Sequence, residues 1–304
     1  MIDWDFPPQQ IKTRSVNKSL STISLPERFV GRRTEMRQYK NELLNGKIQK
    51  LLITGPGGQG KTSLAGKLAF DMEARGYKVL AWSARTENSW REFEYDMQDA
   101  LDSTRAANFD RAKGRYQEQT AKLAETMFGL LMDEYNGQVL LFLDNLESIQ
   151  DLSTHAITDE TIAVWMHAAR ATPGLTVLAT SRWALPDWDG EQLELYHASY
   201  GDFLQMAQAL AQRGQLPAAF LAKRENLYHV YNVLGGNSRA LEFFAAALKN
   251  MKSASEEDLS ASLAHSKKNH RPIWQLKPFT RTCPTRAKFT APARLSPASA
   301  GEGL

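Results

Sequence analysis

Residues 55–62 read G-P-G-G-Q-G-K-T and lie between an apolar run at 50–54 and a run with helical periodicity at 61–75. The two outer glycines of this stretch, followed by Lys and Thr, have the spacing of a P-loop. Glycine lets the backbone turn its N–H groups inward, in conformations that a Cβ would obstruct. The stretch therefore predicts a strand, a phosphate-binding loop and a helix in succession, which is the beginning of a parallel α/β sheet.

Each residue type in this loop has a chemical role. Lys61 would place a cation near the β and γ phosphates, and the Thr62 hydroxyl can ligate magnesium, which prefers oxygen ligands. The helix that begins here adds the positive end of its dipole. We predict a purine nucleotide, ATP or ADP, bound with Mg²⁺. The predicted nucleotide-binding residues of the loop are Gly55, Pro56, Gly57, Gly58, Gln59, Gly60, Lys61, Thr62 and Ser63.

A second segment, V-L-L-F-L-D-N-L-E at residues 139–147, supplies the acid that such a loop needs. Its apolar run is typical of a strand buried on both faces of a parallel sheet, and the strand ends at Asp144. We predict that Asp144 and Thr62 hold the magnesium ion. Asn145 follows and cannot accept a proton. Glu147 is the nearest carboxylate and could polarise water only if a turn brings it round, so slow hydrolysis is expected.

A third segment, L-T-V-L-A-T-S-R at residues 175–182, predicts another strand that ends beside the site. Its terminal Thr180, Ser181 and Arg182 would place hydrogen-bonding groups and a cation near the γ-phosphate. Arg182 is therefore a candidate γ-phosphate sensor. The predicted catalytic set is Lys61, Asp144, Glu147 and Arg182.

The remaining pattern predicts a P-loop NTPase fold of class α/β, in which helices sandwich a parallel sheet and a small helical subdomain follows. Further strands are expected at 79–82 and 192–196, and helices at 34–44, 90–101, 116–135, 161–171, 203–213, 218–233 and 240–251. The segment at 102–115, between two of these helices, is charged and expected to be mobile. The expected divisions are an extended lead-in at 1–26, a nucleotide-binding domain at 27–198, a helical subdomain at 199–265 and a basic disordered tail at 266–304.

Composition narrows the function classes for the 304 residues. No apolar run approaches the roughly 20 residues of a membrane helix, and Cys283 is the only cysteine, so we expect a cytoplasmic protein without an internal disulfide. Residues 266–304 carry eight Lys or Arg and one Glu. Subtracting this charge of +7 from the total of +3 leaves residues 1–265 at −4, so nucleic-acid binding is not the leading expectation.

The order of these motifs resembles the STAND class of P-loop ATPases, which is close to the NB-ARC and AAA+ groups. Two further segments carry the resemblance: F-V-G-R-R-T-E at 29–35 and L-G-G-N-S-R-A-L at 234–241. Two residues depart from the family pattern, because Arg33 replaces the usual Glu and Ser238 replaces the usual Pro. The resemblance implies further nucleotide contacts, with Val30, Gly31 and Arg32 against the adenine and ribose, and Gly236 and Asn237 closing over the nucleotide.

The resemblance also implies a mode of action. A bacterial STAND protein would be a switch that holds ADP when closed, exchanges it for ATP on a signal, and then self-associates. Effector and sensor domains are expected to be missing from this chain or separate, since the region from about residue 266 reads like an out-of-frame translation or else a natural basic tail. The alternatives are an AAA+ initiator or loader acting on DNA, and a small-molecule kinase.

Overall fold

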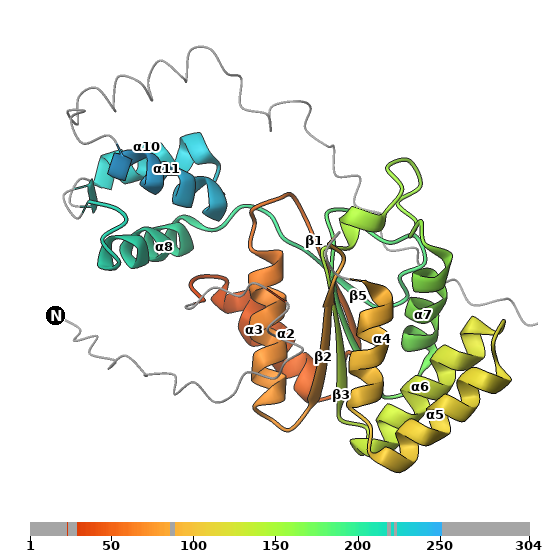
Figure 1. Cartoon of the computed structure of the whole chain (residues 1–304). Helices are drawn as coiled ribbons and strands as arrows, with labels where there is room; N and C mark the ends of the chain where they lie inside the picture. The colour runs from red at the N-terminus through yellow and green to blue at the C-terminus, as the bar shows by residue number, and fades with distance from the viewer. Residues whose placement is uncertain (1–22, 24–28, 86–88, 218–219, 222–223, 251–304) are drawn as a thin grey trace, which may run out of the picture. The chain divides into compact units, whose positions relative to one another are not determined.

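The computed structural model describes residue 23 and residues 29–85, 89–217, 220–221 and 224–250 (Figure 1). All of these lie in the first of two compact units, Met1–Glu256. The second unit, Glu257–Leu304, lies outside the described residues, and so do the predicted basic tail and nearly all of the predicted lead-in.

The described part of the chain contains one five-stranded sheet of order β2-β3-β4-β1-β5, and every pairing in it is parallel. β4 lies between β1 and β3, which places the carboxyl ends of these three strands side by side. The predicted parallel α/β sheet is confirmed. The strands are β1 Lys50–Thr54, β2 Lys78–Ser83, β3 Val139–Asp144, β4 Thr176–Thr180 and β5 Glu191–Glu194.

The sheet is buried on both faces because its central strands are apolar at every position. All six residues of β3 are buried, and they alternate between two separate core clusters. Leu141 and Leu143 enter one cluster, and Leu140 and Phe142 enter the other. This period of two explains why a continuous apolar run, and not an alternating one, marks this strand in the sequence.

Helices cover both faces of the sheet, as the sequence predicts (Figure 1). On one face, Leu43 of α2 and Leu64 and Leu68 of α3 enter the core. On the other face, the buried aromatic side chains include Phe128 and Trp165, whose rings meet edge to face at 5.6 Å. The helices of the first face are α2 Arg33–Leu44 and α3 Lys61–Glu73; those of the second are α4 Trp90–Asp99, α5 Ser103–Arg115, α6 Thr120–Glu134 and α7 Glu160–Ala171.

After Ser199 the described residues form only helices: α8 Tyr200–Gln212, α10 Arg224–Leu234 and α11 Ser238–Asn250. Ser199 caps α8 by accepting a hydrogen bond from the Asp202 N–H at 3.0 Å. Part of the helix expected at 218–233 lies outside the described residues. None of the described helices has both the length and the apolarity needed to cross a bilayer.

The charged segment at 102–115, expected to be a mobile connection between two helices, is itself helical, because α5 spans Ser103–Arg115. Asp102 caps its beginning and accepts a hydrogen bond from the Arg105 N–H at 2.7 Å. The buried side of the helix consists of Phe109 and Ala112, so its apolar stripe is narrow and contains one large residue, which is too few to reveal a helix in the sequence. Helix α6 accordingly begins at Thr120, later than predicted.

Replacing Phe142 with Ala tests the central strand. Phe142 is completely buried in β3, so the cavity and the lost apolar contact should lower the free energy of unfolding by about 3–5 kcal/mol. Chemical denaturation followed by circular dichroism measures this loss. The matched control is Leu152→Ala at a side chain that is 76% exposed, where a change within about 0.5 kcal/mol is expected. Equal effects of the two substitutions would contradict the proposed core.

Candidate functional site

The P-loop follows β1 directly and has the left-handed backbone that its glycines predict. The φ angles are +136° at Gly55, +78° at Gly58 and +85° at Gly60, and Gly60 is the N-cap of α3. A Cβ on Gly55 would lie 2.2 Å from the carbonyl oxygen of Leu195. The loop therefore lies at the carboxyl edge of the sheet, with the N-terminus of α3 directed at it, as anion binding requires.

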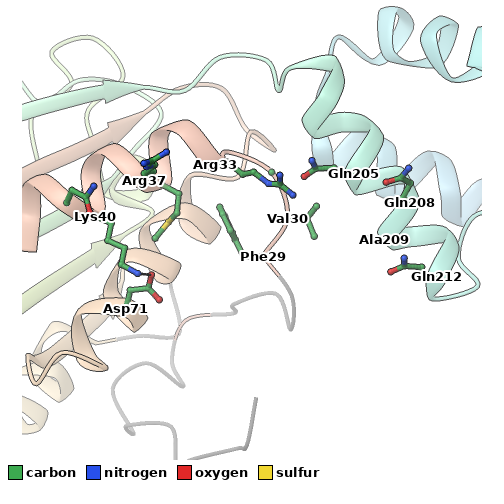
Figure 2. Close-up of a pocket in the computed structure, with 13 residues that line it drawn as sticks. Phe29, Val30, Arg33, Arg37, Lys40, Asp71, Gln205, Gln208, Ala209 and Gln212 are labelled. Carbon is green, nitrogen blue, oxygen red and sulfur yellow. Dashed lines mark hydrogen bonds and ion pairs between the residues drawn. The ribbon is translucent and has the colours of Figure 1, made fainter. Parts of the chain in front are cut away.

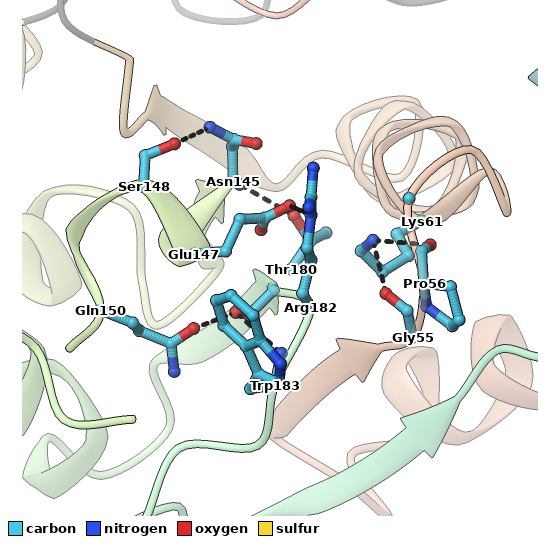
Figure 3. Close-up of polar contacts among 12 residues, drawn as sticks. Gly55, Pro56, Lys61, Asn145, Glu147, Ser148, Gln150, Thr180, Arg182 and Trp183 are labelled. Atoms are coloured by element: carbon cyan, nitrogen blue, oxygen red, sulfur yellow. Dashed lines mark hydrogen bonds and ion pairs between the residues drawn. The ribbon is translucent and has the colours of Figure 1, made fainter. Parts of the chain in front are cut away.

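Lys61 is a buried cation whose hydrogen-bond partners are uncharged. Its side chain donates to the carbonyl oxygens of Gly55 at 2.8 Å and Pro56 at 3.2 Å (Figure 3). No acid among the described residues forms an ion pair with it. Burial lowers the pKa of the Lys61 ammonium, and the negative charge of Glu147 acts in the opposite direction. A phosphate beside Lys61 would supply the missing counter-charge, so this residue fits the predicted nucleotide.

Asp144 is held by three hydroxyl groups at the end of β3. Thr62 donates to its Oδ1 at 2.8 Å, Thr180 donates to the same oxygen at 2.7 Å, and Ser83 donates to Oδ2 at 3.4 Å. The carboxylate is almost completely buried. The two residues predicted to hold magnesium are therefore in direct contact, and their oxygen atoms suit this ion. Bound Mg²⁺ would neutralise charge on the phosphates.

Asn145 makes the turn on which the prediction for Glu147 depends. Its φ is +63°, a conformation that Asn tolerates better than most residues, and the short 3-10 helix η1, Leu146–Ile149, begins immediately after it. Glu147 Oε1 accepts a hydrogen bond from Arg182 Nε at 3.3 Å (Figure 3). Its Oε2 is buried and has no hydrogen-bond partner among the described residues. The turn thus brings Glu147 to the edge of the site and pairs it with Arg182.

Thr180, the last residue of β4, and the two residues after it contact different parts of the site. Thr180 holds Asp144, and its oxygen also accepts from the Asn145 N–H at 2.9 Å. Ser181 donates to the side chain of Gln150. Arg182 reaches the P-loop, since a Cβ on Gly57 would lie 3.7 Å from Arg182 Nη2. Of the three, Arg182 is the one whose cation lies next to the phosphate-binding loop.

The turn that precedes α11 contacts the P-loop backbone. Asn237 Nδ2 donates to the Gly57 carbonyl at 3.0 Å, and Ser238 Oγ donates to the Gly58 carbonyl at 2.7 Å. A Cβ on Gly58 would lie 2.7 Å from Asn237 Oδ1, so glycine is required here for packing as well as for its backbone angle. Gly236 has a φ of +66° and shapes the turn. The hydrogen bond from Ser238 was not predicted from the sequence, where Ser238 was noted only because it replaces the Pro of the family pattern.

Val30 and Arg32 line a cavity of about 110 Å³, called here the adenine-side cavity after the contacts of Val30, Gly31 and Arg32 with adenine and ribose, which stay a prediction. Gly31 packs on α8, because a Cβ there would lie 3.0 Å from Met206 Cε. Arg32 is buried and donates to the carbonyl oxygens of Gln59, Tyr196 and His197. Its guanidinium therefore joins the P-loop to the segment that leads into α8.

Four residues have structural roles at the site that the sequence analysis did not assign: Arg32, Ser83, Thr180 and Ser238. Only the role of Ser83 could have been inferred, from its place in the sheet. In the parallel register Ser83 is paired with Asp144, and the carboxyl ends of neighbouring parallel strands meet at one edge of a sheet. A correct strand order would therefore have placed Ser83 beside the acid. The order itself is not readable from one sequence.

The fold and the loop together define a P-loop NTPase fold, in which β4 separates the P-loop strand from the strand that ends in Asp144. No protein-family model and no curated protein sequence matches this chain.

Several solved structures resemble it in fold. A STAND protein with a tetratricopeptide repeat sensor from Pyrococcus horikoshii is 13% identical with a TM-score of 0.49, over 80% of this chain and 33% of that one. The replication initiator DnaA bound to AMPPCP and single-stranded DNA is 16% identical with a TM-score of 0.46, over 82% and 69%. PCH-2 of C. elegans is 14% identical with a TM-score of 0.45, over 82% and 72%. The chain spans only a third of the STAND protein, and these likenesses concern the fold alone.

Replacing Thr180 with Val tests the hydroxyl cage around Asp144. The substitution removes one donor to the buried carboxylate and leaves the Asn145 N–H without its acceptor, so the free energy of unfolding should fall by about 1–3 kcal/mol. Affinity for magnesium-bound ADP should fall more than affinity for metal-free ADP. Thr126→Val in α6 is the control, since that hydroxyl donates only to its own helix at Lys122, and a change within about 0.5 kcal/mol is expected. Unchanged stability and metal dependence in Thr180→Val would refute the role of the cage.

Proposed function

We propose that this chain binds ATP and ADP with Mg²⁺ at residues 55–63 and acts as the nucleotide-dependent switch of a STAND-type regulatory ATPase. The observation that carries the proposal is the direct contact of the turn at 235–237 and α11 with the P-loop carbonyls of Gly57 and Gly58. The group that would close over a nucleotide is thereby joined to the loop that would bind its phosphates.

The size of the adenine-side cavity supports a coupled movement. Its volume of about 110 Å³ is well below the roughly 300 Å³ at which ligand pockets begin. A nucleotide would have to separate α11 and α8 from the P-loop in order to enter. The side-chain hydrogen bonds from Asn237 and Ser238 would be broken, at a net cost of about 0.5–1.5 kcal/mol each.

These magnitudes suit a switch. A nucleotide at a thousand times its Kd stabilises the form that binds it by about 4 kcal/mol. Breaking the side-chain hydrogen bonds of Asn237 and Ser238 would cost about 1–3 kcal/mol in total, which is less than this stabilisation. The contacts of α11 with the P-loop are weak enough for a bound nucleotide to break, and Arg32 keeps the segment at Tyr196 and His197 attached to Gln59.

The arrangement of Glu147 favours slow hydrolysis. The position after Asp144 is an amide, and the carboxylate of Glu147 is paired with Arg182. A carboxylate oxygen that already accepts a hydrogen bond from a guanidinium is less available to an attacking water. If Arg182 turned towards a γ-phosphate, its hydrogen bond to Glu147 would break. Arg182 would then act as the γ-phosphate sensor, and the carboxylate of Glu147 would become free to polarise water.

An AAA+ initiator or loader acting on DNA is the alternative, because it would share the P-loop and the upstream F-V-G-R-R-T-E segment. The charge of −4 over residues 1–265 argues against a phosphate-binding face of the size that duplex DNA needs. Salt-dependent duplex binding by the protein would favour this alternative.

Replacing Lys61 with Ala tests the nucleotide site. Loss of the buried cation should weaken ADP and ATP binding by about tenfold to a hundredfold, because charge-assisted hydrogen bonds to phosphate contribute about 1.5–3 kcal/mol. Fluorescent-nucleotide titration measures the affinity. Lys47→Ala is the control, since its side chain is 70% exposed and its partner is Glu42. If Lys61→Ala binds nucleotide as well as the control does, the assignment of the site is wrong.

The nucleotide dependence of self-association tests the switch. We expect a smaller species with ADP and a larger assembly with a non-hydrolysable ATP analogue, measured by size-exclusion chromatography with light scattering. Lys61→Ala should show the same mass with either nucleotide. Equal masses of the wild-type protein with ADP and with the analogue would contradict a switch that works by assembly. The nucleotide site itself is tested separately, by the affinity of Lys61→Ala.

A further inference from the structure

A second concavity, of about 1010 Å³, lies between α2 and α8 (Figure 2). Its lining contains no residue of the P-loop. It shares Phe29, Val30 and Ala209 with the small cavity at the adenine side. We call it the α2–α8 groove. Its volume is at the upper end of the range of small-molecule sites, about 300–1,000 Å³.

One wall of the groove is basic. Arg33, Arg37 and Lys40 recur at intervals of four and three residues on α2, so they lie on the same face of the helix (Figure 2). Lys40 is paired with Asp71 at 2.7 Å, and Asp71 is also bonded to Lys67 at 2.7 Å. Arg33 and Arg37 are exposed, and neither forms an ion pair with an acid of the described residues. Two guanidinium groups therefore face the groove without a counter-charge.

The opposite wall carries amides at the positions that line the groove, and the nearby acid Asp202, one turn before Gln205, packs against Gly31. Gln205, Gln208 and Gln212 recur on α8 at helical spacing and line the groove (Figure 2). The amides of Gln205 and Gln208 can each donate two hydrogen bonds and can accept others. Among the residues that line the groove, Asp71 is the only acid, and its two lysine partners already neutralise it. The groove therefore offers positive charge on one wall and neutral hydrogen-bond donors on the other.

We propose that the α2–α8 groove binds a small molecule that carries two or more phosphate groups. Guanidinium groups bind phosphate through two parallel hydrogen bonds, and each phosphate group presents several strong acceptor oxygens. A single carboxylate carries one negative charge and would neutralise only one of the two arginines, whereas a chain of phosphates carries a charge for each of them and further acceptor oxygens for the facing amides. Arg33, which departs from the Glu of the family pattern, acquires a role as one of the two anchors.

The position of the groove couples its ligand to the nucleotide. A molecule held by Arg33 and Gln205 would join α2 to α8, and α8 also lines the adenine-side cavity through Met206 and Ala209. Any movement of α8 that admits a nucleotide changes the groove, so each ligand should alter the affinity of the other by the same factor. This coupling rests on the proposed function, but the binding of an anion to the groove does not.

Titration calorimetry with inorganic tripolyphosphate tests the groove, first without nucleotide and then with saturating ADP at constant excess magnesium. When ADP occupies the P-loop, we expect saturable binding of tripolyphosphate to one remaining site in wild-type protein. The double variant Arg33→Gln/Arg37→Gln should lose affinity about tenfold or more, since each arginine supplies charge-assisted hydrogen bonds. The matched control is Arg111→Gln/Arg115→Gln, which removes two exposed arginines at the same spacing from α5.

Three results would overturn the proposal. They are the absence of saturable binding, an equal loss in the α5 control, and a loss in Lys61→Ala that matches the loss in the groove variant, which would assign the probe to the P-loop. If the groove binds tripolyphosphate but neither the wild type nor any variant binds nucleotide, the assignment of the groove is supported and the proposed switch is refuted. If both bind without altering each other's affinity, the coupling is refuted.

Discussion

The buried carboxylate of Asp144 joins the parts of the candidate site. It receives hydrogen bonds from Thr62 at the start of α3, from Thr180 at the end of β4, and from Ser83 at the end of β2. A buried carboxylate without such donors would cost several kcal/mol, so the positions of these elements are linked by the need to satisfy one group. Placement of the P-loop helix against the sheet thus depends on the same residue that is expected to hold magnesium.

The second constraint is the close approach of the turn at 235–237 to the P-loop. It requires a residue without a side chain at Gly58, and it uses side-chain donors from Asn237 and Ser238. Two hydrogen bonds of ordinary strength join regions that are far apart in the sequence, and both are made to backbone carbonyls of the predicted phosphate-binding loop. A contact of this kind is easily broken by a ligand, which is the property that a switch requires.

The site also shows how one residue type can serve different ends at neighbouring positions. Three arginines lie close together in the sequence or the structure, and each has a different environment. Arg32 is buried and bonded to backbone carbonyls, Arg33 is exposed on the α2–α8 groove, and Arg182 is paired with Glu147 beside the P-loop. The sequence places the first and the third at the nucleotide. Only the tertiary structure shows that Arg32 links backbone segments, that Arg33 is a surface cation and that Arg182 is a candidate sensor.

The sequence by itself determined the elements whose causes are local. Apolar runs marked β1, β3 and β4, since strands buried on both faces have no polar alternation, and the glycine spacing marked the loop because only glycine adopts its backbone angles without strain. Tertiary structure alone decided the strand order, the helix α5 with its narrow buried side, and the hydroxyl partners of Asp144. It also decided that the turn at Asn145 pairs Glu147 with Arg182. These features depend on contacts between residues distant in the chain, and such contacts leave no periodic pattern in a single sequence.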